Sequence, residues 1–87
     1  MKAEKSAVMP LLKTVYGQIG GIIKMVEDDR YCMDISKQVT SAIAILKKVN
    51  VEILDAHMRG CVKEAFNNGN SEEKIEELIS ELNRMLK

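Results

Sequence analysis

Residues 34–66 read DISKQVTSAIAILKKVNVEILDAHMRGCVKEAF, and this stretch decides the fold. Its apolar side chains recur at spacings of three and four, as they do along one face of an α-helix. Because it has no proline, and no glycine before Gly60, we expect one helix of roughly eight or nine turns. The apolar positions are Ile35, Val39, Ala42, Ile43, Leu46, Val49, Ile53, Leu54, Met58, Cys61, Val62 and Phe66.

A shorter helix is expected before the long one. Apolar residues recur with the same spacing from Val8 to Val26, and Pro10 fits only in the first turn of this helix or just before it. The segment EDDRY, residues 27–31, breaks the pattern. It therefore predicts the turn into the long helix.

A third helix is expected after the segment NNGN, residues 67–70. Gly69 suits the left-handed residue that ends a helix, and Asn70 with Glu73 predicts a capping box for the next one. We therefore expect an all-α protomer of three helices with a long central helix, forming a single domain over residues 1–87. The apolar stripe of the third helix is Ile75, Leu78, Ile79, Leu82 and Met85.

Size and composition favour self-association. The chain has 87 residues, of which 46% are hydrophobic but only 3% aromatic. A core this small is marginal in a monomer. We therefore expect a homodimer or a homotetramer.

Charge is balanced overall but uneven along the chain. Thirteen basic and thirteen acidic residues give a formal net charge of zero. Residues 1–48 carry eight Lys or Arg against five Asp or Glu, and residues 49–87 carry five against eight. Zero net charge disfavours non-specific nucleic-acid binding, whereas a basic first half favours it.

The two cysteines are expected to be thiols. The first residues lack a signal-peptide pattern, and no apolar run is long enough to span a membrane, so we expect a cytoplasmic protein. In a reducing compartment, two cysteines serve as metal ligands, reactive thiols or small core residues more often than as a disulfide.

His57 and Cys61 are candidate ligands of one metal ion. They are four residues apart, so their side chains share a face of the long helix one turn apart. Cys32 precedes His57 by 25 residues, or roughly 37 Å along a continuous helix. One chain cannot close such a site, since metal–ligand bonds are only about 2.0–2.3 Å long.

Two chains can close it. If the long helices pair antiparallel and cross near Ile45, Cys32 of one protomer lies opposite His57 and Cys61 of the other. Twofold symmetry then produces two such sites. Two thiolates and one imidazole favour Cu(I), with Zn²⁺ as the second choice because it needs a fourth ligand from water or Glu52.

Each of these residues can also have a purely structural role. A cysteine is often a small buried apolar residue, and a lone histidine often packs or caps a helix. The six methionines are scattered, and several fall on the apolar stripes. They are therefore interpreted as core residues and not as copper-transport ligands.

Two segments resemble a known family. GQIGGIIKMVEDDRYCMDISKQV and VEILDAHMRGCVKEA are similar to the CsoR/RcnR family of bacterial metal-sensing repressors, over about residues 11–66. The resemblance implies three-helix protomers that pair through antiparallel long helices, commonly into tetramers, and that leave operator DNA when the effector binds.

Within this family, the ligand pattern resembles that of the copper-sensing branch. Its Cys, His and Cys ligands come from two subunits and match Cys32, His57 and Cys61. Nickel and cobalt sensors usually add an N-terminal histidine and have histidine at the third position, and this chain has neither. Formaldehyde-responsive members lack the third cysteine, and persulfide sensors lack the histidine. The resemblance therefore implies Cu(I).

The resemblance also implies a coupling network. Tyr31 and Glu77 match positions that the copper branch couples to the ligating histidine. An acceptor on the second ring nitrogen fixes the orientation of a metal-bound imidazole. From the sequence alone, Glu77 would be an ordinary solvated carboxylate.

The chain departs from the family at the expected DNA contacts. Arginines or other polar residues of many relatives are replaced by Leu11, Thr14, Gly20 and Ile43. Lys13, Lys24 and Lys48 are basic at or near matching positions, although they could equally be an ordinary soluble surface. Lysine cannot reproduce the bidentate contact of arginine, so we expect weaker and more salt-sensitive operator binding.

Three functions remain open at this point. The first is a Cu(I)-responsive repressor that binds operator DNA. The second is a copper-binding protein of the same fold that has lost DNA binding, and the third is a redox sensor that joins Cys32 to Cys61 between subunits. An enzyme with a small-molecule substrate is not expected, because no oxyanion-hole or cofactor motif is present.

Overall fold

The computed structural model describes residues 1–69 and 71–86, except the side chains of residues 62, 65, 66 and 71. It contains three helices, α1 (Lys5–Glu27), α2 (Cys32–Asn68) and α3 (Ser71–Met85), and no strand among the described residues. The all-α prediction with a long central helix is confirmed. None of the described helices is apolar over a stretch that would cross a membrane.

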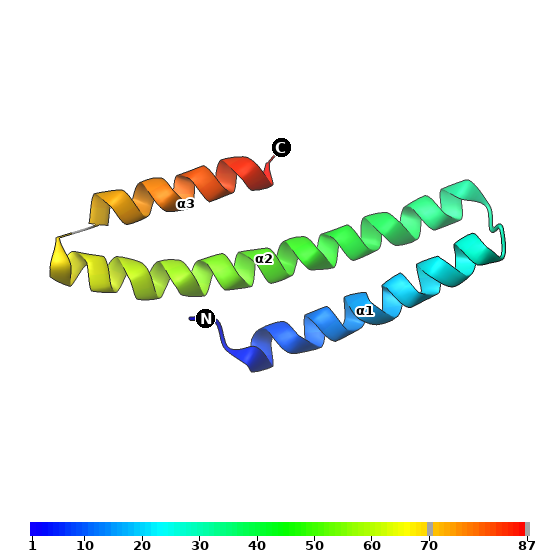
Figure 1. The fold of residues 1–87 in the computed structure, drawn as a ribbon, viewed down its shortest axis with the longest axis horizontal. Coiled ribbons are helices and arrows are strands. Elements are labelled where there is room, and N and C mark those ends of the chain that lie inside the picture. Colours follow the sequence, from blue (N-terminus) through cyan, green and yellow to red (C-terminus); the bar gives the residue numbers. More distant parts are fainter. Residues whose placement is uncertain (70, 87) are drawn as a thin grey trace. The chain divides into compact units, whose positions relative to one another are not determined.

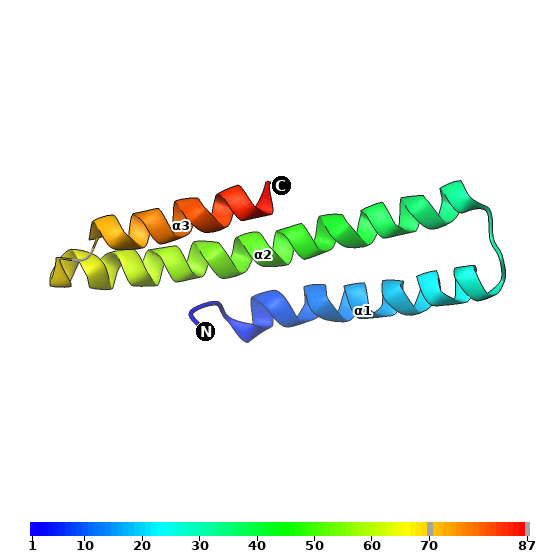
Figure 2. The same ribbon diagram turned by 45° about the horizontal axis from the view of Figure 1, so that its top comes forward.

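Contacts divide the chain into two compact units, one of residues 4–52 and one of residues 53–87 with residues 1–3. In the first unit, α1 runs antiparallel to the first part of α2 (Figures 1 and 2). Val8 and Val15 of α1 are buried, as are Ala42 and Val49 of α2. Each pair is seven residues apart, the repeat expected where two helices pack along one seam.

The turn between α1 and α2 satisfies the end of α1 with its own backbone. Asp29 has a positive φ of 52°, its N–H donates to the carbonyl of Val26, and the N–H of Arg30 donates to that of Met25. This pair of bonds around a left-handed residue is the Schellman motif. The motif explains how EDDRY ends the helix without a glycine.

The position of Pro10 differs from the sequence prediction, which put it in or before the first turn. Helix α1 begins at Lys5 and Pro10 lies inside it, so that prediction is wrong. A proline here leaves the carbonyl of Ser6 without a helical donor. Ser6 is exposed, so water can reach this carbonyl, and the helix continues through Pro10.

A second apolar stripe on the 4–52 unit flanks the hairpin seam and remains exposed. Its members also recur at spacings of three and four, but each is between 39% and 83% exposed. A set of large apolar side chains at this spacing is typical of a helix face that packs against further helices. They are Leu12, Tyr16, Ile19, Ile23 and Val26 of α1, and Val39, Ile43 and Leu46 of α2.

In the second unit, α3 lies alongside the last part of α2 (Figure 1). Gly69 has φ +79°, which confirms the predicted left-handed residue at the end of α2. Asn70, the predicted cap of α3, lies outside the described residues. Within the expected stripe of α3, Leu78 and Met85 are half-buried, while Ile75, Ile79 and Leu82 are more exposed.

Candidate metal-binding site

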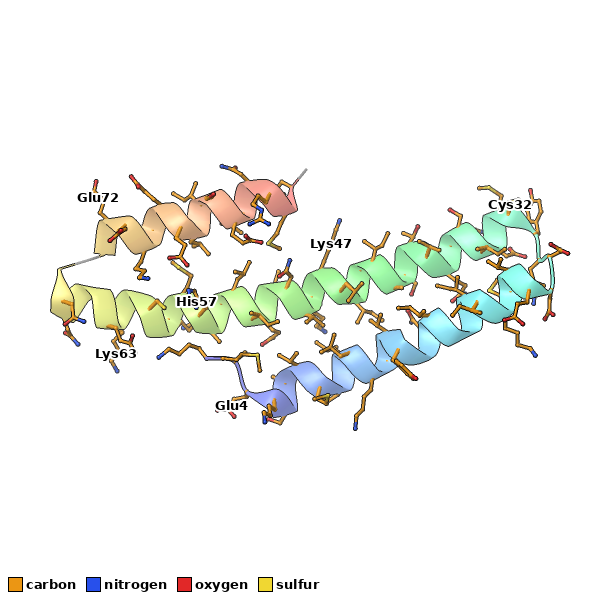
Figure 3. The ribbon with its side chains drawn as sticks, viewed as in Figure 1. Glu4, Cys32, Lys47, His57, Lys63 and Glu72 are labelled. Atoms are coloured by element: carbon orange, nitrogen blue, oxygen red, sulfur yellow. The ribbon has the colours of Figure 1, made fainter. Side chains whose placement is uncertain are left out.

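His57 and Cys61 are in contact on α2. The sulfur of Cys61 lies 3.4 Å from Nε2 and 3.7 Å from Nδ1 of His57, and both residues are half-buried. Figure 3 places His57 on the part of α2 that runs beside α3. The helical spacing of four residues therefore brings a thiol and an imidazole together without any long-range folding.

The two side chains are close enough to reach one ion. Two ligands bound at about 2.0 and 2.3 Å to one metal lie roughly 3.5–3.7 Å apart at tetrahedral or trigonal angles. The sulfur lies 3.7 Å from Nδ1, within this range, and 3.4 Å from Nε2, just below it. Because the sulfur is close to both ring nitrogens at once, neither nitrogen points its lone pair at a position shared with the sulfur, and the ring must turn to bind a common ion. A thiolate with an imidazole is a soft donor pair, which fits Cu(I) and also accepts Zn²⁺.

The two side chains open onto a cavity of about 390 Å³ within the second unit. Met1, Lys2, Met58 and Glu77 are among its other lining residues. Oε1 of Glu77 lies 3.7 Å from Nε2 of His57, and Oε2 lies 3.5 Å from Nζ of Lys74. Helix α3 therefore supplies a carboxylate directly to the histidine of the pair.

Cys32 is the first residue of α2, in the other compact unit, and its thiol is exposed. Tyr31, which precedes it, is 68% exposed, and its carbonyl accepts the N–H groups of Asp34 and Ile35 at the start of α2. Within the described part of the chain, no three His, Cys, Asp or Glu side chains form a group that could hold a metal ion. The structure therefore joins His57 to Cys61 and to Glu77, but it does not join them to Cys32 or Tyr31.

An ion pair lies beside the site. Nζ of Lys2 donates to Oε1 of Glu64 at 2.8 Å. This hydrogen bond and the attraction between the charges raise the pKa of Lys2 and lower the pKa of Glu64. Glu64 would release the pair only as the pH falls through its lowered pKa, and Lys2 only as the pH rises through its raised pKa. Both groups are therefore charged at neutral pH.

Sequence reasoning missed Lys2 and Glu64. They are 62 residues apart, and no periodicity or motif connects them. The one available signal was Gly60, a residue without a side chain beside a candidate ligand. The three candidate DNA contacts, Lys13, Lys24 and Lys48, are all exposed, the first two on α1 and the third on α2.

Residues 4–84 match the family model of metal-sensitive transcriptional repressors, and the chain belongs to this family. The relatives that it matches place it in the copper-sensing CsoR branch, which confirms the expected resemblance. Proteins of this family are transcriptional repressors, which confirms that the chain is not an enzyme.

Three relatives illustrate the match. A copper-sensing transcriptional repressor CsoR from Bacillus subtilis (strain 168) is 38% identical over 84 residues, covering 97% of this chain and 83% of the relative. The crystal structure of the copper-sensing repressor CsoR with Cu(I) from Geobacillus thermodenitrificans NG80-2 superposes with a TM-score of 0.85. It is 36% identical and covers 95% of this chain and 86% of that one. The nickel-responsive transcriptional regulator InrS superposes with a TM-score of 0.79 at 31% identity, covering 97% and 94%.

Proposed function

We propose that this protein is a cytoplasmic Cu(I)-responsive repressor that binds operator DNA without metal and releases it when Cu(I) binds. Cys32 of one protomer and His57 and Cys61 of another hold the ion. The observation that carries this proposal is the contact of Cys61 with His57 on α2, which puts a thiol and an imidazole within reach of one ion. Zn²⁺ remains the second choice.

A second protomer is needed to complete the proposed site. His57 and Cys61 supply two ligands, and Cys32 belongs to the other compact unit. The exposed second apolar stripe, defined above on α1 and α2, supports an assembly in which two hairpins pack together. We propose an antiparallel homodimer of this kind, which can pair again into a homotetramer.

Glu77 is proposed to couple the site to the rest of the protomer. It lies 3.7 Å from Nε2 of His57, so a change in the orientation of the imidazole alters a contact with α3. Tyr31 is the second member of the proposed network. When Cu(I) is bound, His57 is fixed in the orientation that the ion requires, and α3 follows through Glu77.

Operator DNA is proposed to bind the basic residues of the first half of the chain. Lys13, Lys24 and Lys48 are exposed, as phosphate contacts must be. Lysine acts there as a point charge, which gives affinity with little base specificity.

The test is fluorescence anisotropy of the reduced protein on DNA from its own upstream region, with and without one Cu(I) per protomer. We expect binding that Cu(I) abolishes in the unmodified protein, and binding that persists with Cu(I) in Cys61→Ser. Ni²⁺ and Zn²⁺, added separately, measure the selectivity for the metal. Absence of binding at low salt together with tight Cu(I) uptake would instead support the copper-binding protein without DNA binding.

A further inference from the structure

The first three residues are part of the same unit as the candidate ligands. Met1–Ala3 group with residues 53–87 and not with α1, which they precede. Ala3 is 8% exposed, and Met1 and Lys2 line the cavity that contains His57 and Cys61. We call residues 1–3 the strap.

The side chain of Lys2 lies across α2 at Gly60. A methyl group at Gly60 would lie 3.0 Å from Cδ, 3.2 Å from Cε and 3.4 Å from Cγ of Lys2. Because Gly60 has only a hydrogen atom where other residues have a side chain, the side chain of Lys2 can rest on the helix backbone. The ammonium group continues past Gly60 to Glu64, where it forms the 2.8 Å ion pair.

The anchor points of this path flank one ligand of the proposed site. Gly60 immediately precedes Cys61, and Glu64 follows it by three residues, so the two anchor points of Lys2 lie before and after the cysteine on α2. Lys2 and Cys61 also line the same cavity. Lys2 therefore lies at the cavity onto which the thiol opens.

We propose that the strap closes the cavity over Cys61 in the metal-free protein, with Lys2 as the positioning residue and Glu64 as its anchor. The strap must open before Cys61 can receive an ion from outside, so it controls the rate at which the site exchanges metal. The inference rests on the proposed function only in taking His57 and Cys61 as ligands.

The closed strap can be measured on the metal-free protein by alkylation with iodoacetamide. Mass spectrometry gives separate rates for Cys61 and for Cys32, which is exposed and serves as the internal reference. We expect Glu64→Gln and Lys2→Met each to raise the Cys61/Cys32 rate ratio by about two- to fivefold, the range set by an exposed ion pair. Lys2→Arg, which keeps the charge and reaches Glu64, is expected to retain the ratio of the unmodified protein.

The matched control is Lys63→Met. Lys63 lies two residues from Cys61 on α2, points away from α3 in Figure 3, and takes part in none of the ion pairs found among the described residues. Lys63→Met removes one lysine charge near Cys61 and leaves the strap residues unchanged, so the ratio should stay unchanged. Circular dichroism of each variant checks that the helices are retained.

Two results would overturn the proposal. An unchanged ratio in both Glu64→Gln and Lys2→Met means that the strap does not cover Cys61. Loss of a cover should raise the Cys61/Cys32 ratio in both variants. If the ratio rises in Glu64→Gln but falls in Lys2→Met, Lys2 acts on the thiol only through its charge.

The test of the strap is independent of the test of the proposed function. The alkylation ratio is measured without copper or DNA, so it can confirm the strap even if copper has no effect on DNA binding. A second readout, the rate of Cu(I) transfer from loaded protein to the chelator bathocuproine disulfonate, should rise in Glu64→Gln and Lys2→Met and not in Lys63→Met. An unchanged transfer rate would contradict the role of the strap in exchange.

Discussion

Nε2 of His57 lies 3.7 Å from a carboxylate oxygen of Glu77, and the same nitrogen faces the sulfur of Cys61 at 3.4 Å. One nitrogen therefore serves two partners. A metal ion shared with Cys61 either takes Nε2 away from Glu77 or requires the ring to present Nδ1, which lies 3.7 Å from the sulfur. In the first case Glu77 loses its contact with His57, and in the second the contact is kept while the ion fixes the ring.

Glu77→Ala should uncouple copper from DNA release. We expect the ratio of DNA affinities without and with Cu(I) to fall at least about tenfold, within the usual range of coupling energies. The affinity for Cu(I) in the absence of DNA should fall far less than in Cys61→Ser. Anisotropy and a Cu(I) competition titration measure the two quantities.

The control for this change is Glu76→Ala, which removes an exposed carboxylate from the neighbouring position of α3. It should leave the coupling intact. If Glu77→Ala also keeps full copper-driven release, the contact with His57 is not the route of coupling.

Mixing two inactive variants should rebuild the metal site. Cys32→Ser and Cys61→Ser should each lose tight Cu(I) binding, since each removes one ligand from every site. In a heterodimer of the two, one of the two sites keeps all its ligands. A random equimolar mixture should therefore recover about a quarter of the Cu(I) stoichiometry of the unmodified protein.

Recovery requires that protomers exchange, which mass spectrometry of the mixture checks. Tight binding by Cys32→Ser alone would show that His57 and Cys61 suffice. No recovery in exchanged heterodimers would rule out a site shared between subunits.

DNA affinity should depend steeply on salt. Because Lys13, Lys24 and Lys48 are the proposed phosphate contacts, we expect their substitution by Met to weaken binding in each case. The slope of log affinity against log salt should fall by about 0.9 for each phosphate that the variant no longer neutralises. Lys63→Met, on the part of α2 in the other unit, is the matched control and should keep the slope.

The turn after α1 should accept a glycine at Asp29. Its φ of 52° is unfavourable for a side chain, so Asp29→Gly should stabilise the fold by about 0.5–1 kcal/mol. At a fixed protein concentration, this corresponds to a rise of about 2–8 °C in the thermal midpoint. Asp28→Gly is the control: Asp28 has φ −88°, and glycine there should destabilise the protein.

The helices and half of the candidate site follow from local sequence. Apolar spacing and the absence of breakers place α2, and Gly69 places its end. The contact of His57 with Cys61 follows from a spacing of four residues, because helical geometry alone puts both side chains on one face. The start of α1 does not follow in this way, since a proline usually marks a first turn and here the exposed carbonyl of Ser6 tolerates it.

The remaining parts depend on contacts between distant residues. Lys2 meets Glu64, and Glu77 meets His57, through packing that no local pattern encodes. Sequence resemblance indicated Glu77 in advance. Nothing indicated Lys2, because a lysine near a chain end resembles any other surface lysine until its neighbours are known.

The exposed second stripe on α1 and α2 has a consequence for how much active protein a cell contains. We expect a protomer with these large apolar side chains in water to gain most of its stability from the proposed partners, so that folding and assembly become one equilibrium governed by mass action. We expect the thermal midpoint to rise with protein concentration. A cell that makes too few copies would then lose the protein to unfolding and proteolysis, and the abundance of the protein would respond more than proportionally to its rate of synthesis.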